Sequence, residues 1–182
     1  MPRQRTILRE NILDASMELL RSSGFSQFTA RQIAIKMNSS TQPIYKEFKN
    51  MEDLKVGLLE YIKQYLSETV FNSHHTTDPL EEVCEKYILF AKKEPTLFSA
   101  IYMDRELEVV QLHNYSYEMI EKILKETDSE YDEKNILPFL NILWPSVLGV
   151  AMLVAQGKIQ YDQNQINQKV KDILNTSLTL LA

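Results

Sequence analysis

Apolar residues recur along the chain at helical spacing, and this pattern predicts an all-α fold. In residues 6–24 the apolar positions follow the three- and four-residue steps of one helix face, at Leu8, Ile12, Ala15, Leu19 and Leu20. Gly24 ends this predicted helix, because glycine accepts the positive φ that is common at helix C-termini. The chain shows no strand-like alternation of any length.

A second, short helix is predicted to begin at Thr29. The pattern Thr29-x-x-Gln32 is a capping box, in which each side chain satisfies a free backbone donor of the first turn. Asn38 follows the helix and can turn the chain sharply, since asparagine tolerates the left-handed conformation better than most residues. A tight turn is therefore expected directly after this helix.

A third helix, short and polar, is predicted over residues 41–49. Ser40 or Thr41 can cap it, and Ile44 and Phe48 are four residues apart and face one way. Two helical turns are too short to be stable alone in water. Burial of these two apolar side chains must therefore hold the helix against its neighbours, which leaves its polar rows outside.

The rest of the chain is predicted to continue as helices of varied length. Asn50 caps the first of them, with Asp53 three residues later. The expected ranges are 50–72, 79 to about 93, 96–104, 107–126, 135–156 with a bend at Pro145, and a last helix with an apolar stripe over 166–181. The prediction is thus about nine helices in two domains, a three-helix head (residues 1–49) and a helical body (residues 50–182).

Charge is distributed unevenly between these two parts. The net charge is −5, but residues 1–50 carry eight Lys and Arg against four Asp and Glu, and the remainder carries twelve against twenty-one. A basic head on an acidic body indicates a partner that is a polyanion. Ordinary scatter of surface charge is the alternative.

The single cysteine and the apolar runs exclude some classes of protein. Cys84 cannot form a disulfide within its own chain, and no CxxC motif is present for zinc or redox chemistry. No apolar run approaches the roughly 20 residues of a membrane span, and the N-terminus lacks the apolar core of a signal peptide. We therefore expect a cytoplasmic protein with no membrane partner.

Two helices joined by a tight turn, the second short and polar, form a helix-turn-helix, whose second helix enters the major groove of DNA. Gln42 can pair with adenine, and Lys46 can donate to guanine or to a phosphate. The methyl and ring carbons of Thr41 and Pro43 can touch thymine methyls. Three further residues are better placed for phosphates, Tyr45, Lys49 and Arg31. A plain three-helix bundle with a solvated polar face is the alternative.

The same segment carries a recognisable pattern of residues in register. It consists of Ile12, Leu13, Ala15, Leu19, Leu20, Gly24, Phe25, Thr29, Ile33, Ala34, Ile44, Tyr45, Phe48, Lys49 and Leu54. With this pattern, residues 6–54 resemble the N-terminal DNA-binding domain of the TetR family of transcriptional regulators. The resemblance implies that residues 40–46, Ser40 included, approach the bases. Asn38 stands where the family commonly has glycine, and Ser39 where a buried aliphatic residue is usual.

The body resembles the ligand-binding and dimerisation domain of that family in size and helix count. In the family the last two helices pack against a second subunit. The residues agree, because the helix over 135–156 is too apolar to be solvated and the last helix has an apolar stripe of its own. We predict a homodimer whose interface includes Leu148, Met152, Val170, Leu174 and Leu178.

A small-molecule site in the body is a further expectation. Apolar clefts lined by aromatic residues are typical ligand sites, and the candidates are Phe98, Tyr102, Tyr117 and Trp144. The same side chains are also what a helical core needs, and core is the default interpretation of each.

Catalytic, cofactor and metal sites are not predicted. His74 and His75 are adjacent and point in different directions, which makes a poor chelate. The sequence has no Gly-rich phosphate loop, no H-E-x-x-H and no G-x-S-x-G. An enzyme is therefore the weaker alternative.

The resemblance implies a homodimeric, ligand-responsive regulator that binds double-stranded DNA at a palindromic operator. Regulators of this family are more often repressors than activators. An apolar small molecule is the expected effector. The rival interpretations are a binding module whose head contacts protein, and a small helical enzyme.

Overall fold

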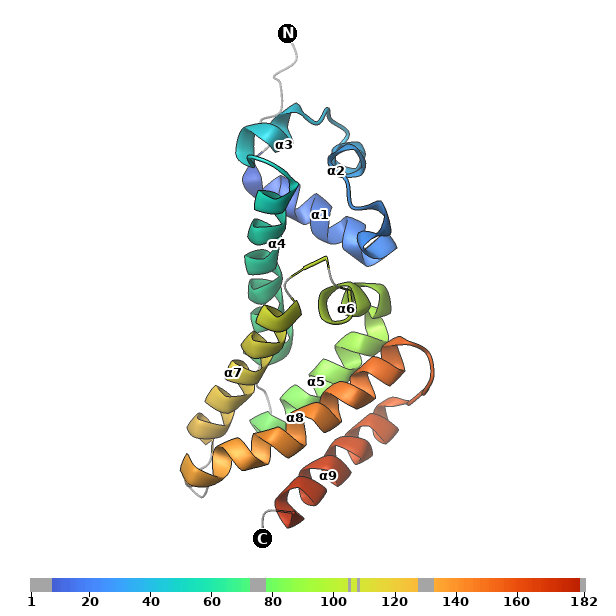
Figure 1. The fold of residues 1–182 in the computed structure, drawn as a ribbon. Helices are drawn as coiled ribbons and strands as arrows, with labels where there is room; N and C mark the ends of the chain where they lie inside the picture. The colour runs from blue at the N-terminus through green and yellow to red at the C-terminus, as the bar shows by residue number, and fades with distance from the viewer. Residues whose placement is uncertain (1–7, 73–77, 105, 108, 128–132, 181–182) are drawn as a thin grey trace.

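The computed structural model describes residues 8–72, 78–104, 106–107, 109–127 and 133–180 of the chain. Within these residues the chain forms nine α-helices and no strand, which confirms the predicted all-α fold (Figure 1). The two adjacent histidines of the sequence, His74 and His75, lie outside the described residues.

The head consists of three helices that pack together at one end of the molecule (Figure 1). They are α1 (Arg9–Ser23), α2 (Ala30–Lys36) and α3 (Gln42–Glu47), with a 3₁₀ turn, Gly24–Gln27, between the first two. Gly24 ends α1 with a φ of +59°, as predicted. The side chain of Thr29 caps α2 by accepting a hydrogen bond of 3.3 Å from the amide of Gln32.

The turn between α2 and α3 is closed by its own backbone hydrogen bonds. Asn38 takes a φ of +52°, the left-handed conformation expected from the sequence. The amide of Ser39 donates to the carbonyl of Ala34 at 2.9 Å, and that of Asn38 donates to Ile35 at 3.0 Å. This pair of bonds is a Schellman motif. Asparagine therefore fills the position where the family has glycine without opening the turn.

The apolar side of α3 is buried, as its short length requires. Ile44 and Phe48 are each 1% exposed and belong to the core. The expected side-chain cap, in contrast, does not form at Thr41. Thr41 already has helical backbone angles, φ −75° and ψ −12°, so its hydroxyl is not directed at the free amides of the first turn. Pro43, in that turn, has no amide hydrogen that needs a cap.

Helix α4 (Met51–Leu66) runs from the head to the body and continues into a π-helical turn, Ser67–Phe71 (Figure 1). Its predicted cap at Asn50 is confirmed, and a second hydrogen bond joins Asp53 to the residue before the cap. The Asn50 side chain accepts from the amide of Asp53 at 2.9 Å, and the Asp53 carboxylate accepts from the amide of Lys49 at 2.9 Å. The end of α3 is thereby connected to the start of α4.

Five helices build the body, with α8 packed between α5 and α9 and with α6 beneath α1 (Figure 1). They are α5 (Pro79–Lys93), α6 (Pro95–Tyr102), α7 (Val109–Thr127), α8 (Glu133–Ala155) and α9 (Gln163–Thr179). These bounds lie close to the predicted ranges. Gly157 follows the last turn of α8 and takes a φ of +67°, which agrees with the prediction that this glycine ends the helix.

One helix corrects the expectation about membrane spans. Within the described residues, Asn135–Ala155 of α8 is long and apolar enough, by length and composition alone, to cross a membrane. The sequence predicts this helix as strongly apolar, but polar and proline residues interrupt its apolar run, so no span was expected there. In the fold this helix packs against α5, α6, α7 and α9, which is also what a core helix of high apolar content does.

Candidate nucleic-acid interface

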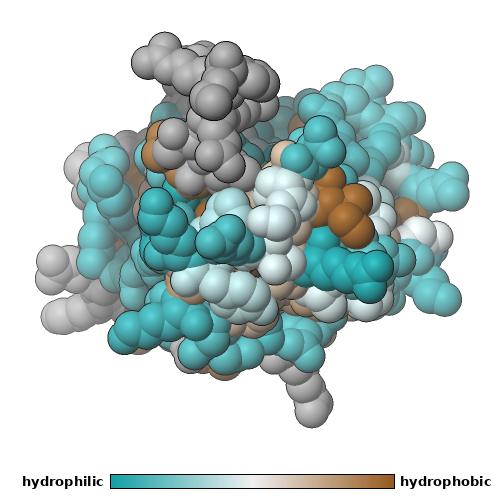
Figure 2. Space-filling model, turned by 90° about the horizontal axis from the view of Figure 1, so that it is seen from above, coloured by the Kyte–Doolittle hydropathy of each residue, from teal (hydrophilic) through white to brown (hydrophobic). Residues whose placement is uncertain are grey.

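The residues predicted to contact DNA are all at least partly exposed at the surface of the head. Arg31, Ser40, Gln42, Tyr45, Lys46 and Lys49 are exposed, and Thr41 and Pro43 are partly exposed. Tyr45 is 53% exposed although it is a large aromatic residue. Viewed from the head end, the molecule is mainly hydrophilic with one distinct apolar patch (Figure 2).

This arrangement follows from the two sides of α3. Burying Ile44 and Phe48 turns the opposite polar rows outward. Each of these two buried side chains stabilises the fold by about 1.5–3 kcal/mol relative to an exposed one. A short helix held in this way on a turn from a preceding helix has the dimensions and the polarity of an element that enters the major groove.

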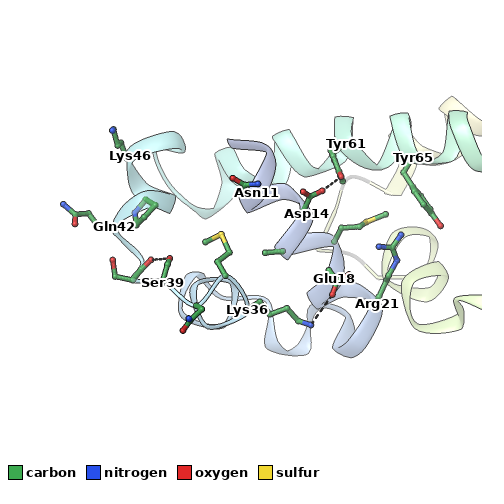
Figure 3. Close-up of a pocket in the computed structure, with 16 residues that line it drawn as sticks. Asn11, Asp14, Glu18, Arg21, Lys36, Ser39, Gln42, Lys46, Tyr61 and Tyr65 are labelled. Carbon is green, nitrogen blue, oxygen red and sulfur yellow. Dashed lines mark hydrogen bonds and ion pairs between the residues drawn. The ribbon is translucent and has the colours of Figure 1, made fainter. Parts of the chain in front are cut away.

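A cleft of about 1210 Å³ runs beside this surface, along the exposed row of α1 (Figure 3). Asn11, Asp14 and Glu18 contribute to its lining, and Gln42 and Lys46 stand at one end and point away from it (Figure 3). The lining carries charges of both signs, Asp14 and Glu18 on one hand and Arg21, Lys36 and Lys46 on the other, so it shows no clear preference for an anion or a cation.

Tyr61 of α4 closes one side of the cleft and holds α4 to α1. Its hydroxyl donates a hydrogen bond to the carboxylate of Asp14. This bond, together with partial burial, raises the pKa of Tyr61 to about 12. The tyrosine therefore stays protonated near neutral pH and remains a donor.

The far end of the cleft contains a junction of three helices. Nε of Arg21 in α1 donates to the carboxylate of Glu94 at 2.7 Å, and the hydroxyl of Tyr65 in α4 donates to the same carboxylate. The Arg21 guanidinium also lies 5.0 Å from the centre of the Tyr65 ring. Glu94 sits at the corner between α5 and α6. One body carboxylate thus contacts both the head and the connecting helix.

A second ion pair connects α4 to the body. Nζ of Lys55 lies 2.8 Å from a carboxylate oxygen of Glu106 and 3.2 Å from one of Glu52. The hydrogen bond to Glu106 is the main reason that the pKa of Lys55 is raised. Neither this pair nor the Glu94 junction could be predicted from the sequence, because both join residues that are far apart along the chain.

The predicted ligand residues divide into two groups. Phe98, Tyr102 and Trp144 are buried and pack around Tyr87, with ring centroids 5.6, 5.4 and 4.6 Å from that ring. Tyr117 is half-buried, and its hydroxyl donates to Asn141 at 3.3 Å. None of the four lines the cleft in the head. Three of them therefore form a continuous aromatic cluster in the body core.

Two polar atoms of this aromatic cluster have no hydrogen-bond partner among the described residues, the hydroxyl of Tyr87 and the indole nitrogen of Trp144. The Tyr102 hydroxyl lies near that of Tyr87, and it pairs with the hydroxyl of Ser116 at 2.8 Å. Burial raises the pKa of Tyr87 and lowers that of His113, whose ring centroid is 5.4 Å from that of Tyr102. The cluster is thus apolar with two buried, unsatisfied donors.

The predicted dimer residues lie on α8 and α9 but differ in exposure. Leu178 is 43% exposed, and Leu148, Met152 and Leu174 are partly exposed. Val170, in contrast, is fully buried within the protomer, so its side chain is not available to a partner. The spacing of apolar residues in α9 does not tell which of them are buried within the protomer and which are exposed, because the same stripe faces both α8 and the surface.

Comparison with known proteins agrees with this geometry. Residues 12–56 match the family model of bacterial regulatory proteins, tetR family. These residues contain most of α1, all of α2 and α3, and the first turn of α4. No curated protein matches the chain.

Solved structures share the fold over nearly the whole chain. A TetR-like transcriptional regulator from Rhodococcus sp. RHA1 has a TM-score of 0.67 at 18% identity, with 98% of each chain covered. SmeT, the repressor of the Stenotrophomonas maltophilia multidrug efflux pump SmeDEF, has a TM-score of 0.62 at 16% identity. The match covers 96% of this chain and 90% of SmeT. FadR from Bacillus subtilis, in complex with stearoyl-CoA, has a TM-score of 0.64 at 15% identity. The match covers 94% of this chain and 98% of FadR.

An exposed short helix on a tight turn, carried by a helical body, defines a helix-turn-helix DNA-binding regulator. The head matches the tetR family model over residues 12–56, and the whole chain shares its fold with solved TetR-like regulators, in agreement with the resemblance seen in its residues.

Proposed function

We propose that this chain is a ligand-responsive, sequence-specific repressor that acts as a homodimer on a palindromic operator. Residues 1–49 form the DNA-binding domain of the proposal, and residues 50–182 the ligand-binding and dimerisation domain. The observation that carries the DNA-binding part is the exposure of the polar side of α3 over a buried Ile44 and Phe48. Two such heads would contact successive major grooves about 34–36 Å apart.

The exposed residues of the head take different roles in this proposal. Gln42 and Lys46 contact base edges, with Ser40, Thr41 and Pro43 close to them. Arg31, Tyr45 and Lys49 bind phosphates, which position the head without reading sequence.

Replacing Lys49 by alanine is expected to weaken binding to all sequences alike. Lys49 is exposed beyond the end of α3, where a phosphate contact is electrostatic and independent of sequence. The plot of log affinity against log salt should become shallower by about one unit. An unchanged slope, measured by fluorescence anisotropy over a salt series, would mean that Lys49 touches no phosphate.

Replacing Gln42 by alanine is expected to relax base preference at one or two positions. A side chain that pairs bidentately with adenine contributes about 1–3 kcal/mol of discrimination. The measurement is the affinity for the selected site and for each single base-pair variant of it. If the ratios of these affinities stay as in the wild type, Gln42 does not contact a base, and a different side of α3 faces the DNA.

The homodimer of this proposal forms through α8 and α9. In the most apolar stretch of α8, 39% is buried within the protomer, and Leu148 and Met152 are partly exposed there. Leu153 and Leu178 are 41% and 43% exposed on these two helices. Exposed apolar patches of this kind indicate an interaction surface. A second copy of the chain is the proposed partner, because a palindromic site requires two heads.

The effector of this proposal binds in the body beside the aromatic cluster. A buried donor without a partner costs about 1–3 kcal/mol, so a ligand with a hydrogen-bond acceptor for Tyr87 or Trp144 would recover that energy. The apolar rings around these donors favour an otherwise apolar molecule. The FadR structure with stearoyl-CoA is of a protein with the same fold that holds a molecule with a long apolar chain.

Coupling between effector and DNA would pass through the contacts between body and head. Glu94 lies at the start of α6 and holds both Arg21 and Tyr65, so a shift of the α5–α6 corner would move α1 and α4 together. A coupling of about 1–3 kcal/mol changes DNA affinity roughly 5- to 150-fold.

Salt separates this proposal from its main rival, a head that contacts protein. A head that binds DNA loses affinity steeply as salt rises, because counterions are released from the phosphates. Binding to duplex DNA that is weak at low salt and insensitive to salt would favour the protein partner. Turnover of a substrate by the body would favour the enzyme interpretation.

A further inference from the structure

Arg9, in the first turn of α1, contacts the C-terminal end of α3. Its Nη1 donates a hydrogen bond of 3.2 Å to the carbonyl oxygen of Glu47. Glu47 is the last residue of α3, so its carbonyl is among those that a helix leaves without a partner. The guanidinium carbon of Arg9 lies 4.0 Å from the centroid of the Phe48 ring, in a cation–π contact. One side chain therefore satisfies the end of α3 and covers the ring that anchors it.

Gly57 of α4 forms the third side of this contact. A Cβ atom there would lie 2.9 Å from Nη2 of Arg9 and 3.0 Å from Cε1 of Phe48. Glycine inside a helix is less stable than alanine, and the φ of Gly57 is not positive, so the backbone does not require it. The close approach of α4 to the Arg9–Phe48 pair does require it.

We infer that Arg9 is a positioning residue for the DNA-reading helix: it fixes α3 against α1 and α4 and does not itself bind DNA. The inference rests on the proposed role of α3 in reading bases. Because α3 has six residues, a small change at its C-terminal end is transmitted to Gln42 and Lys46, within a turn or two of it. The guanidinium suits this task, since its planar group stacks on a ring and donates at its edge at the same time.

Hydrogen–deuterium exchange of the free, full-length protein tests the inference without DNA. In Arg9→Ala the amides of residues 42–49 are expected to exchange about 10-fold faster, the factor for losing one charge-assisted hydrogen bond. Exchange in α9 is expected to stay as in the wild type. Glu10→Ala, a change at the neighbouring exposed position, is the control and should leave residues 42–49 unchanged. Equal exchange in Arg9→Ala and the wild type would overturn the inference.

Gly57→Ala provides a second variant that keeps Arg9 in the chain. Its methyl group displaces the guanidinium, so faster exchange of residues 42–49 is expected here as well. In the Arg9→Ala background the methyl no longer meets the guanidinium and only the close contact with Phe48 is left, so a smaller further change is expected than in the wild type. Gly149→Ala is the matched control, since a Cβ at that helical glycine meets nothing within 4 Å. Fully additive effects of Arg9→Ala and Gly57→Ala would contradict the contact.

Binding to DNA distinguishes positioning from direct contact. The probes are a duplex selected from random DNA by the wild-type chain and an unrelated duplex of equal length. Arg9→Ala is expected to lose about 10-fold in affinity for the selected duplex, with unchanged affinity for the other duplex and an unchanged salt slope. A slope lower by about one unit, with equal loss on both duplexes, would show that Arg9 binds a phosphate and overturn the inference. If the wild type prefers no duplex, the proposed function fails, and the exchange measurement still decides the role of Arg9.

Discussion

Phe48→Ala is expected to abolish sequence-specific DNA binding while the body stays folded. The side chain is 1% exposed and lies beneath Arg9 at the end of α3. Truncating a buried phenylalanine to alanine costs about 3–5 kcal/mol, from lost burial and the cavity that remains. A helix of six residues has no stability of its own to offset this loss. The exposed polar rows of α3 would then no longer form one fixed surface.

The measurement combines DNA affinity with chemical denaturation and sedimentation. We expect loss of preference for the selected duplex, an early unfolding step of the head, and a sedimentation coefficient like that of the wild type. Val56→Ala is the control, because Val56 is 64% exposed on α4, and such surface changes stay within about 0.5 kcal/mol. Unchanged DNA affinity in Phe48→Ala would mean that α3 does not depend on this anchor.

Leu178→Glu is expected to convert the proposed dimer into monomers. The side chain is 43% exposed in the protomer, so the protomer should still fold with a carboxylate there. In a dimer interface the same carboxylate would be buried without a partner, which is strongly unfavourable. Each head would then bind alone, and affinity for a two-half-site duplex should fall roughly 10²- to 10⁴-fold.

Sedimentation velocity and binding to one-half and two-half sites measure this effect. Thr176→Glu is the matched control, since it adds the same charge at an exposed position on the opposite side of α9 from Leu178. We expect the control to remain dimeric and to keep its affinity. A Leu178→Glu protein that still sediments as a dimer would place the interface on another surface.

The sequence predicted the head in detail because its signals are local. Gly24 and Asn38 mark the ends of helices through their own backbone preferences, and both take the positive φ expected of them. Ile44 and Phe48 reveal their buried side through a four-residue spacing. Of the two caps that the sequence offers, Ser40 and Thr41, the one at Thr41 does not form, because the backbone there is already helical.

The contacts between distant segments could not be predicted from the sequence. Arg9 reaches Glu47, and Arg21 reaches Glu94, across separations that no periodicity encodes. Nothing in the sequence around Gly57 indicates why a glycine stands inside a long helix. The close packing of Arg9 and Phe48 against α4 provides the reason. Val170 belongs to the same stripe as Leu178 but is buried within the protomer, since a stripe does not tell which neighbour covers it.

Selection of binding sites from random duplex DNA by the full-length chain tests the central claim most directly. We expect an enriched, palindromic sequence with half-sites one helical turn, about 34–36 Å, apart. We also expect that Gln42→Ala selects a site with relaxed preference at one or two symmetric positions. Absence of any enriched sequence at low salt, with the protein folded and dimeric, would contradict the claim that the outer face of α3 reads DNA.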